Sequence, residues 1–229
     1  MRLPRLADHV IFDLDGVLLY TERFYTEVTQ SIVGRYGKTF DWSVKGNMVG
    51  RPAIESARYL VATLDLPISP EDYLREREEM LRARFVHSEP CAGARELTCA
   101  LAARGVRQAI ATSSERALFE LKTERHREWL RVFAAVVLGD DPRLVRGKPA
   151  PDIFLLAAED LGVDPTTCVV LEDSPVGIAA AHAAGMQAIA VPDPAMDRTR
   201  FADAELLVAS LLELTPDDLG LGARTSTRR

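Results

Sequence analysis

Two aspartates, Asp13 and Asp15, stand two positions apart directly after an apolar run at residues 10–12, and Gly16 follows them. On an extended segment, side chains two residues apart point to the same side, so both carboxylates would reach one space. Two carboxylates at close range repel each other unless a cation lies near both. Carboxylate and carbonyl oxygens suit the hard cation Mg²⁺. The pair therefore predicts a magnesium site at the end of the first strand.

Polar residues also stand at the ends of three further apolar runs. These residues are Thr112, Ser113 and Ser114 after residues 108–111, Lys148 in "RGKPAPD" after residues 134–139, and Glu172 and Asp173 after residues 168–171. One polar strand end is usually a helix cap or a turn, but ligands of open parallel sheets bind where the strands' carboxyl ends meet. A lysine, hydroxyls and the N–H groups at a helix start bind anions. Together with Mg²⁺ these groups predict a phosphate site.

The spacing of the two aspartates then fits a reaction at phosphorus. Asp13 can attack the phosphorus atom, while Asp15 protonates the leaving oxygen and later takes a proton from water. Gly16 permits the sharp turn that brings the following loop around the site. An aspartyl-phosphate intermediate divides one difficult hydrolysis into two easier steps.

The elements that must position these groups alternate between strand and helix. We expect strands at 9–14, 108–112, 134–139, 168–173 and 187–192, and helices at 94–104, 115–128, 152–161 and 176–184. This alternation, with short apolar strands, predicts an α/β fold: a Rossmann-like, doubly wound parallel sheet with helices on both faces.

A helical insert interrupts this pattern after the first strand. Apolar residues recur at helical spacing from Thr21 to Tyr36 and again after Gly50, and a third helix begins at Ser69 with the start signal "SPED". We therefore expect an α/β core domain formed by residues 1–19 and 89–229 and a helical domain at 20–88.

The composition narrows the classes of partner. Among 229 residues the formal net charge is −6, which argues against a protein that binds nucleic acid or an anionic membrane. We see no apolar run of the roughly 18 residues that a membrane span needs, and no signal peptide. Three cysteines without a CxxC pair favour free thiols and a cytoplasmic location. The oligomeric state stays open, a monomer included.

Four motifs carry a resemblance to a known family. "FDLDG", "ATSS", "GKPAPD" and "LEDSPVGIAAAHAAGM" resemble the motifs of the haloacid dehalogenase-like phosphohydrolases, and the helical insert resembles that superfamily's C1 cap. The resemblance implies Asp13 as nucleophile and Asp15 as general acid and base. It implies Mg²⁺ ligands from Asp13, the main-chain carbonyl of Asp15, Asp173 and, as a further candidate, Glu172. It implies phosphate contacts from Thr112, Ser113 and Lys148.

A finer resemblance concerns the substrate. "GKPAPDIFLLAA" and "KTERH" (residues 122–126) resemble the pseudouridine-5'-phosphatase group and its glycerol-phosphatase relatives. Arg51 is either a solvated arginine or a contact to the substrate, since similar families often have a basic residue there. Tyr20 stands where the family usually has an acid that caps the next helix, and we expect Thr21 to replace it as the cap.

The resulting expectation is a Mg²⁺-dependent phosphatase of a small phosphate ester, with pseudouridine 5'-phosphate as the leading candidate. Phosphatases of glycerol 3-phosphate or 2-deoxyglucose 6-phosphate remain alternatives, as does a β-phosphoglucomutase-like mutase, which shares all four motifs. A signalling receiver domain is about half this length and lacks the insert. A phosphate-binding module without catalysis would have no need of the second aspartate, Asp15.

Overall fold

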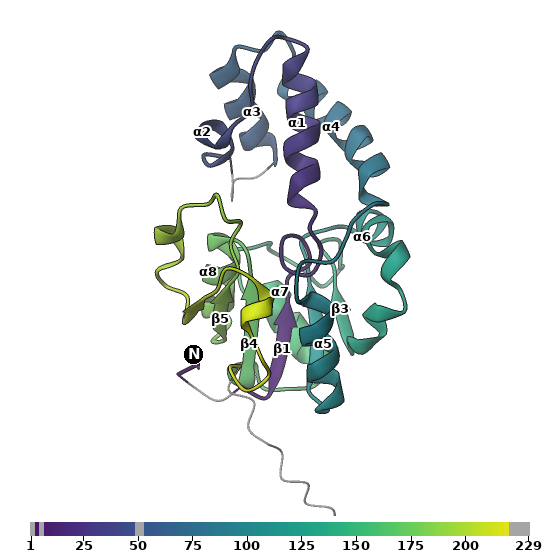
Figure 1. Cartoon of the computed structure of the whole chain (residues 1–229), viewed down its shortest axis with the longest axis vertical. Coiled ribbons are helices and arrows are strands. Elements are labelled where there is room, and N and C mark those ends of the chain that lie inside the picture. Colours follow the sequence, from purple (N-terminus) through teal and green to yellow (C-terminus); the bar gives the residue numbers. More distant parts are fainter. Residues whose placement is uncertain (1–2, 5–6, 49–52, 220–229) are drawn as a thin grey trace, which may run out of the picture.

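The core of the molecule is a six-stranded sheet. The computed structural model describes residues 3–4, 7–48 and 53–219. The strands are β1 (His9–Phe12), β2 (Arg107–Ala111), β3 (Ala135–Val137), β4 (Cys168–Glu172), β5 (Gln187–Ala190) and β6 (Leu206–Leu207). They lie in the order β3-β2-β1-β4-β5-β6, and all neighbours are parallel (Figure 1). The predicted doubly wound α/β fold is confirmed.

Apolar side chains on both faces of the sheet are buried by helices. In β1, Val10 and Phe12 join one buried cluster and Ile11 joins another on the opposite face. The first cluster is covered by α5 (Ala94–Ala103) and the second by α7 (Asp152–Leu161) and α8 (Pro175–Ala183). Residues 10–12 of the central strand are therefore apolar and buried, and Asp13 follows where the chain leaves the sheet.

Four helices between β1 and β2 form a separate apolar cluster above the strands' carboxyl ends (Figure 1). They are α1 (Glu22–Gly34), α2 (Trp42–Lys45), α3 (Ala53–Leu64) and α4 (Pro70–Phe85). The two connections to the sheet run together, since Tyr20 N–H donates to the carbonyl of Glu89 at 2.8 Å. We accordingly propose that residues 20–88, the helical unit, are one domain and residues 1–19 and 89–219 belong to the other.

The two predicted helix starts have different outcomes. The Ser69 hydroxyl accepts the N–H of Asp72, so the cap expected at α4 is confirmed. Thr21 stands at the N-cap position of α1, but its side chain accepts no capping hydrogen bond, so that prediction was wrong. The reason is that the backbone of Thr21 is already helical, at φ −93° and ψ −22°, and its hydroxyl donates to Asp15 instead.

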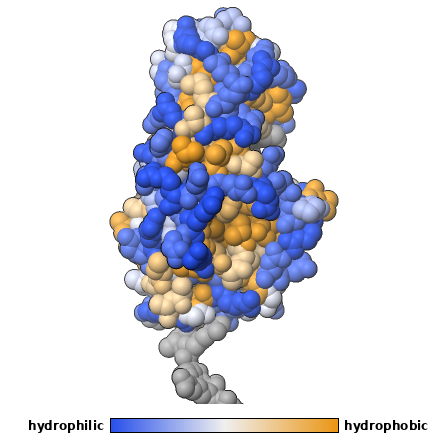
Figure 2. Space-filling model, turned by 90° about the vertical axis from the view of Figure 1, so that its right-hand side faces the viewer, coloured by the Kyte–Doolittle hydropathy of each residue, from blue (hydrophilic) through white to orange (hydrophobic). Residues whose placement is uncertain are grey.

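The structure differs from the expected elements in a few places, and the clearest difference is in the helix after β2. The helix expected at 115–128 ends early: α6 spans Arg116–Thr123 and two 3₁₀ helices follow, at Glu124–His126 and Trp129–Val132. Three further 3₁₀ segments lie at Pro165–Thr167, Arg198–Phe201 and Leu211–Glu213. In the described part, no helix is both long and apolar enough to span a membrane. Figure 2 shows hydrophilic side chains over much of one face, with apolar groups where the upper and lower parts meet.

Candidate active site

The polar strand ends converge at one cleft between the sheet and the helical unit. Asp13 is held directly after β1 because its N–H donates to the carbonyl of Leu171 in β4 at 3.0 Å. The cleft has a volume of about 810 Å³, and its lining includes Asp13, Asp15, Thr112, Ser113, Lys148, Glu172 and Asp173. All the site residues expected on the sheet therefore line the same space.

Lys148 bridges two buried carboxylates. Its Nζ lies 2.5 Å from Oδ1 of Asp13 and 2.5 Å from Oε1 of Glu172. Burial raises the pKa of Asp13 to about 7 against the opposing charge of Lys148, and the charges of Glu172 and Asp15 add to the rise. Burial alone would lower the pKa of Lys148, but the two carboxylates hold it above its usual value. Lys148 therefore stays charged beside Asp13.

Glu172, the further candidate for a metal ligand, accepts hydrogen bonds at both of its carboxylate oxygens. While Oε1 accepts from Lys148, Oε2 accepts from both the N–H and the hydroxyl of Ser174, at 2.9 and 2.8 Å. A Cβ at Gly177 would lie 1.9 Å from the carboxyl carbon of Glu172, so the backbone there closes tightly around this group. Both oxygens of Glu172 are engaged, and it serves as the partner that holds Lys148.

The carboxylate of Asp15 accepts hydrogen bonds from three residues, Thr21, Ser114 and Lys122. Its Oδ1 accepts from the hydroxyl of Thr21 at 2.6 Å and its Oδ2 from the hydroxyl of Ser114 at 2.8 Å. Lys122, in α6, donates to both oxygens at 2.7 and 2.9 Å. Burial alone would raise the pKa of Asp15, but the charge of Lys122 and these hydrogen bonds hold it below its usual value.

Sequence reasoning missed Lys122 as a site residue. Its side chain is fully buried, and it pairs with an aspartate 107 positions earlier in the chain. The segment "KTERH", which begins with Lys122, resembles one group within the family. That resemblance alone does not indicate which of its residues belongs to the site.

Asp173 is a carboxylate that lies near Lys148 but has no direct contact with it. In the described part of the chain it forms no hydrogen bond and no ion pair. Burial raises its pKa, and the charges of Glu172 and Asp13 raise it further. A Cβ at Gly16 would lie 2.1 Å from Oδ2 of Asp173, so only glycine lets the first loop approach this carboxylate. Such crowded anions fit a hard divalent cation.

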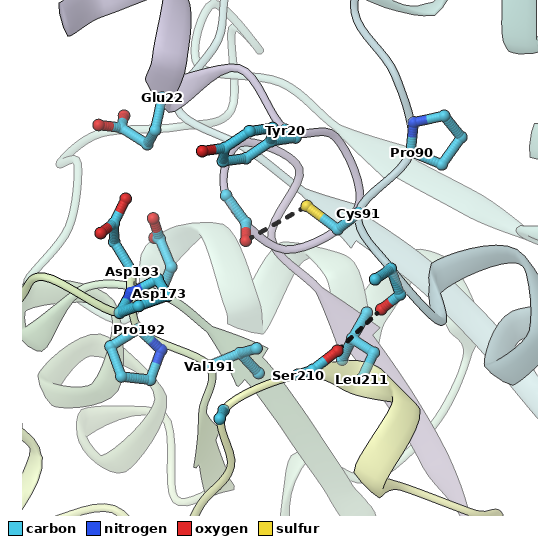
Figure 3. Close-up of a pocket in the computed structure, with 14 residues that line it drawn as sticks. Tyr20, Glu22, Pro90, Cys91, Asp173, Val191, Pro192, Asp193, Ser210 and Leu211 are labelled. Atoms are coloured by element: carbon cyan, nitrogen blue, oxygen red, sulfur yellow. Dashed lines mark hydrogen bonds between the residues drawn. The ribbon is translucent and has the colours of Figure 1, made fainter.

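A smaller hollow of about 280 Å³ adjoins the cleft and shares three of its acids. In Figure 3 Asp173 and Asp193 point up toward Glu22, beside Tyr20. Among the residues that the structure describes, however, no three His, Cys, Asp or Glu side chains already form a metal site by themselves. A cation here would need main-chain oxygen and water ligands besides the carboxylates.

Thr112 and Ser113, the expected phosphate contacts after β2, line the same cleft as these acids. Thr112 is buried, and its hydroxyl oxygen accepts the N–H of Ser114 at 3.0 Å, which shapes the loop after β2. Ser113 is exposed and lines the cleft. The N–H of Arg116, at the start of α6, donates to both oxygens of Asp140, so this helix end is occupied by a carboxylate of the protein itself.

The helical unit covers the far side of the cleft. Glu22 pairs with Lys45 at 3.2 Å, and Glu78 pairs with Arg82 at 2.7 Å. The guanidinium of Arg77 lies 5.8 and 5.6 Å from the ring centres of Tyr25 and Tyr73, and within the described residues no carboxylate pairs with it. Arg51, the specificity residue expected from the sequence, lies outside the described residues.

Comparisons with known proteins show what this chain is similar to. The profile of the haloacid dehalogenase-like hydrolases matches residues 7–185. The chain is 48% identical to "(DL)-glycerol-3-phosphatase 1, mitochondrial" of Arabidopsis thaliana, over 93% of this chain and 73% of that protein. It is 41% identical to a Drosophila melanogaster protein named "Probable pseudouridine-5'-phosphatase", over 98% of each chain. A crystal structure from Deinococcus radiodurans, described as a HAD family hydrolase with bound phosphate and sodium, has a TM-score of 0.79 and 32% identity, over 94% of this chain and 97% of that chain.

Proposed function

The chain belongs to the haloacid dehalogenase-like hydrolases and is a phosphatase by its named relatives, and we propose that it hydrolyses a small phosphate monoester through an aspartyl-phosphate at Asp13. The observation that supports this most is that two neighbouring aspartates, Asp13 and Asp15, have pKa values shifted in opposite directions by their surroundings. Asp13 stands beside the charged Lys148 at the cleft, while Asp15 is held by three donors. Two carboxylates in different environments can take different roles in one reaction.

In this proposal the residues of the cleft divide the reaction between them. The carboxylate of Asp13 attacks phosphorus, and the ammonium of Lys148 balances the charge of Asp13 and of the phosphate oxygens. Asp15 gives a proton to the leaving oxygen, and its carboxylate then takes a proton from the water that attacks the phosphorylated Asp13. Thr112 and Ser113 donate hydrogen bonds to the phosphate from the loop after β2.

Magnesium is the cofactor that the donor set fits. Asp13, Asp173 and the main-chain carbonyl of Asp15 would hold it, with Glu172 acting through Lys148 rather than as a ligand. When bound, Mg²⁺ would supply positive charge to the phosphate oxygens and to the crowded carboxylates.

For the substrate, pseudouridine 5'-phosphate remains our leading candidate, and glycerol 3-phosphate is the alternative that the first-named relative supports. The cleft of about 810 Å³ has room for a nucleoside monophosphate as well as for the smaller glycerol 3-phosphate. Arg77, on α4, lines the same cleft as Asp13, and its guanidinium N–H groups suit carbonyl oxygens of a base. Arg51 remains a second candidate for this role.

We propose a cytoplasmic location because the described cysteines, Cys91, Cys99 and Cys168, are all free thiols. One relative is named as mitochondrial, and localisation of a tagged full-length chain would decide between the two compartments.

A panel of phosphate esters with Mg²⁺ tests the proposed function. The panel contains p-nitrophenyl phosphate, pseudouridine 5'-phosphate, glycerol 3-phosphate, 2-deoxyglucose 6-phosphate and β-glucose 1-phosphate. We expect steady phosphate release, with the highest kcat/KM on pseudouridine 5'-phosphate. A tenfold preference for another ester would reject this substrate, and isomerised glucose phosphate without phosphate release would indicate a mutase.

A further inference from the structure

Lys122 is a buried lysine that the reaction outlined above does not use. Its ammonium donates three hydrogen bonds, to the two carboxylate oxygens of Asp15 and, at 2.8 Å, to the hydroxyl of Ser114. An ammonium has three N–H donors, so all of them are used within this one cluster. Ser114 in turn donates to Asp15, so Lys122 holds Asp15 both directly and through the serine.

The same ammonium lies against the helical unit. Its Nζ is 4.4 Å from the ring centre of Phe85, the last residue of α4, and 6.0 Å from that of Tyr25 in α1. Both rings belong to the apolar cluster of the helical unit, whereas Lys122 is on α6 of the core. An ammonium over aromatic faces is attracted by them, most strongly when water is excluded.

A third contact links Asp15 to the helical unit. Thr21, immediately before α1, donates its hydroxyl to Oδ1 of Asp15. The carboxylate therefore touches the start of α1 through Thr21 and the end of α4 through Lys122 and Phe85. Those two points are where the helical unit leaves the core and returns to it.

We infer that Lys122 is a positioning residue: it fixes the carboxylate of Asp15 for proton transfer and does so only while α1 and α4 are seated on the core. The inference rests on the proposed phosphatase function and extends it. A substrate that brings the helical unit onto the core would thereby also set the acid and base in place, which couples closure to chemistry. Lys122 itself does not contact the phosphate in this account.

A double-mutant cycle between Lys122 and Asp15 tests the inference. We compare the full chain, Lys122→Met, Asp15→Asn and the double variant, measuring kcat/KM with Mg²⁺ on pseudouridine 5'-phosphate or glycerol 3-phosphate, whichever is the better substrate. Lys122→Met should lower kcat/KM about 10- to 100-fold in the natural chain, within the range of proton-transfer contributions. In the Asp15→Asn background it should change kcat/KM less than about threefold, because residues acting through one another are not additive.

A leaving group that needs no proton gives a second readout. On p-nitrophenyl phosphate, Lys122→Met should lower kcat/KM much less than on the alkyl phosphate, because kcat/KM reports the steps up to transfer onto Asp13. If Lys122 were merely structural, Lys122→Met would lower kcat/KM equally on p-nitrophenyl phosphate and on the alkyl phosphate. Thr123→Val is the control: Thr123 is the buried neighbour on α6, and among the described residues its hydroxyl donates only to the carbonyl of Phe119, at 2.7 Å.

The coupling to the helical unit has its own pair of variants. Phe85→Leu removes the ring that faces Lys122 and should reproduce part of the loss, again only in chains that retain Asp15. Phe24→Leu is the matched control, since Phe24 packs edge-on against Phe85 in the same cluster and forms no ring contact with Lys122 among the described residues.

The outcomes separate the two levels of the account. If the natural chain releases no phosphate from any ester, the proposed function fails. If the natural chain is active and the losses from Lys122→Met and Asp15→Asn multiply, or fall equally on both kinds of ester, the positioning role is overturned. If Lys122→Met does not fold, Lys122→Arg takes its place in the same cycle. Arginine keeps the positive charge, but its planar guanidinium cannot donate to Asp15 and Ser114 as the ammonium does. We expect an intermediate loss of kcat/KM that is equally non-additive with Asp15→Asn.

Discussion

At the scale of single residues, Lys148 separates two buried carboxylates that would otherwise face each other. Lys148→Ala should lower kcat at least about 100-fold, because Asp13 and Glu172 would lose their shared cation in a buried site. Lys148→Arg should recover only part of this loss, since the planar guanidinium does not replace a compact ammonium. Steady-state kinetics with Mg²⁺ measures both.

The control for this prediction is Arg146→Ala. Arg146 lies two residues away on the exposed part of the same loop and pairs with Asp152 at 3.1 Å. Its removal should leave kcat within about twofold, as is usual for an exposed ion pair. A Lys148→Ala variant with kcat as high as that of Arg146→Ala would contradict the role given to Lys148.

The same residues show what the sequence could reveal. Asp13 and Asp173 were predictable because each directly follows an apolar strand, and parallel strands bring such ends together. Lys122 was not predictable in this way, since it lies within a helix and acts through a contact with Asp15 that only the packed structure reveals. Glu172 was correctly placed at a strand end, but its partners, Lys148 and Ser174, could not be derived from its position in the chain.

At the scale of elements, the loop after β1 depends on Gly16. This residue has φ +85°, and a Cβ there would meet Oδ2 of Asp173 at 2.1 Å. We therefore expect Gly16→Ala to displace Asp173 and to weaken Mg²⁺ binding at least about tenfold, as titration calorimetry would show.

Gly37→Ala isolates the backbone contribution. Gly37 has φ +70°, but a Cβ there would meet nothing within 4 Å. This variant should lose about 1 kcal/mol of unfolding free energy, from the strained φ alone, and bind Mg²⁺ normally. Equal Mg²⁺ affinity in both variants would mean that the approach of Gly16 to Asp173 does not shape the site.

The element that sequence reasoning extended too far is α6. Its periodic pattern predicts a helix to residue 128, yet the helix ends at Thr123. Beyond it, the ring of His126 is hydrogen-bonded to the carbonyl of Ser88, and Trp129 donates to the hydroxyl of Thr98. These contacts with distant segments outweigh the local helix propensity, which is a weak determinant by comparison.

At the scale of the whole molecule, the buried acids should make stability depend on pH and on Mg²⁺. Burial raises the pKa of Asp13 to about 7 and raises that of Asp173, so in the metal-free protein both bind protons more tightly when folded. The contribution of Asp13 to the free energy of unfolding is therefore complete below about pH 4 and is lost as the pH rises through about 7, by up to about 1.4 kcal/mol per pH unit. Asp173 changes the free energy of unfolding in the same direction, because its pKa is also raised in the folded chain.

Thermal unfolding measures this dependence. The melting temperature of the metal-free chain should fall between about pH 5 and about pH 8, and Mg²⁺ should raise it more at the higher pH, where the carboxylates are ionised. The Asp13→Asn, Asp173→Asn double variant should flatten the pH dependence and remove the effect of Mg²⁺. An effect of Mg²⁺ that is equal at all pH values, or unchanged in the double variant, would contradict a cation site at these carboxylates.

The parallel, doubly wound sheet was within reach of the sequence because strand and helix alternate and apolar runs are short. The edge strand β6, with two residues, was not, because Leu206 and Leu207 carry no pattern of their own and pair with β5 only in the folded chain. The shape of the cleft was also not predictable, since it depends on how α1 and α4 sit over the sheet.

The central claim is that a phosphoryl group passes through Asp13, and trapping that intermediate tests it most directly. The Asp15→Asn variant, mixed with p-nitrophenyl phosphate and Mg²⁺, should still be phosphorylated, because this leaving group needs no proton, and should release phosphate slowly for want of a base. After an acid quench, peptide mass spectrometry should find one phosphoryl group on Asp13. A label on any other residue, or none while p-nitrophenol is released in a burst, would contradict the account.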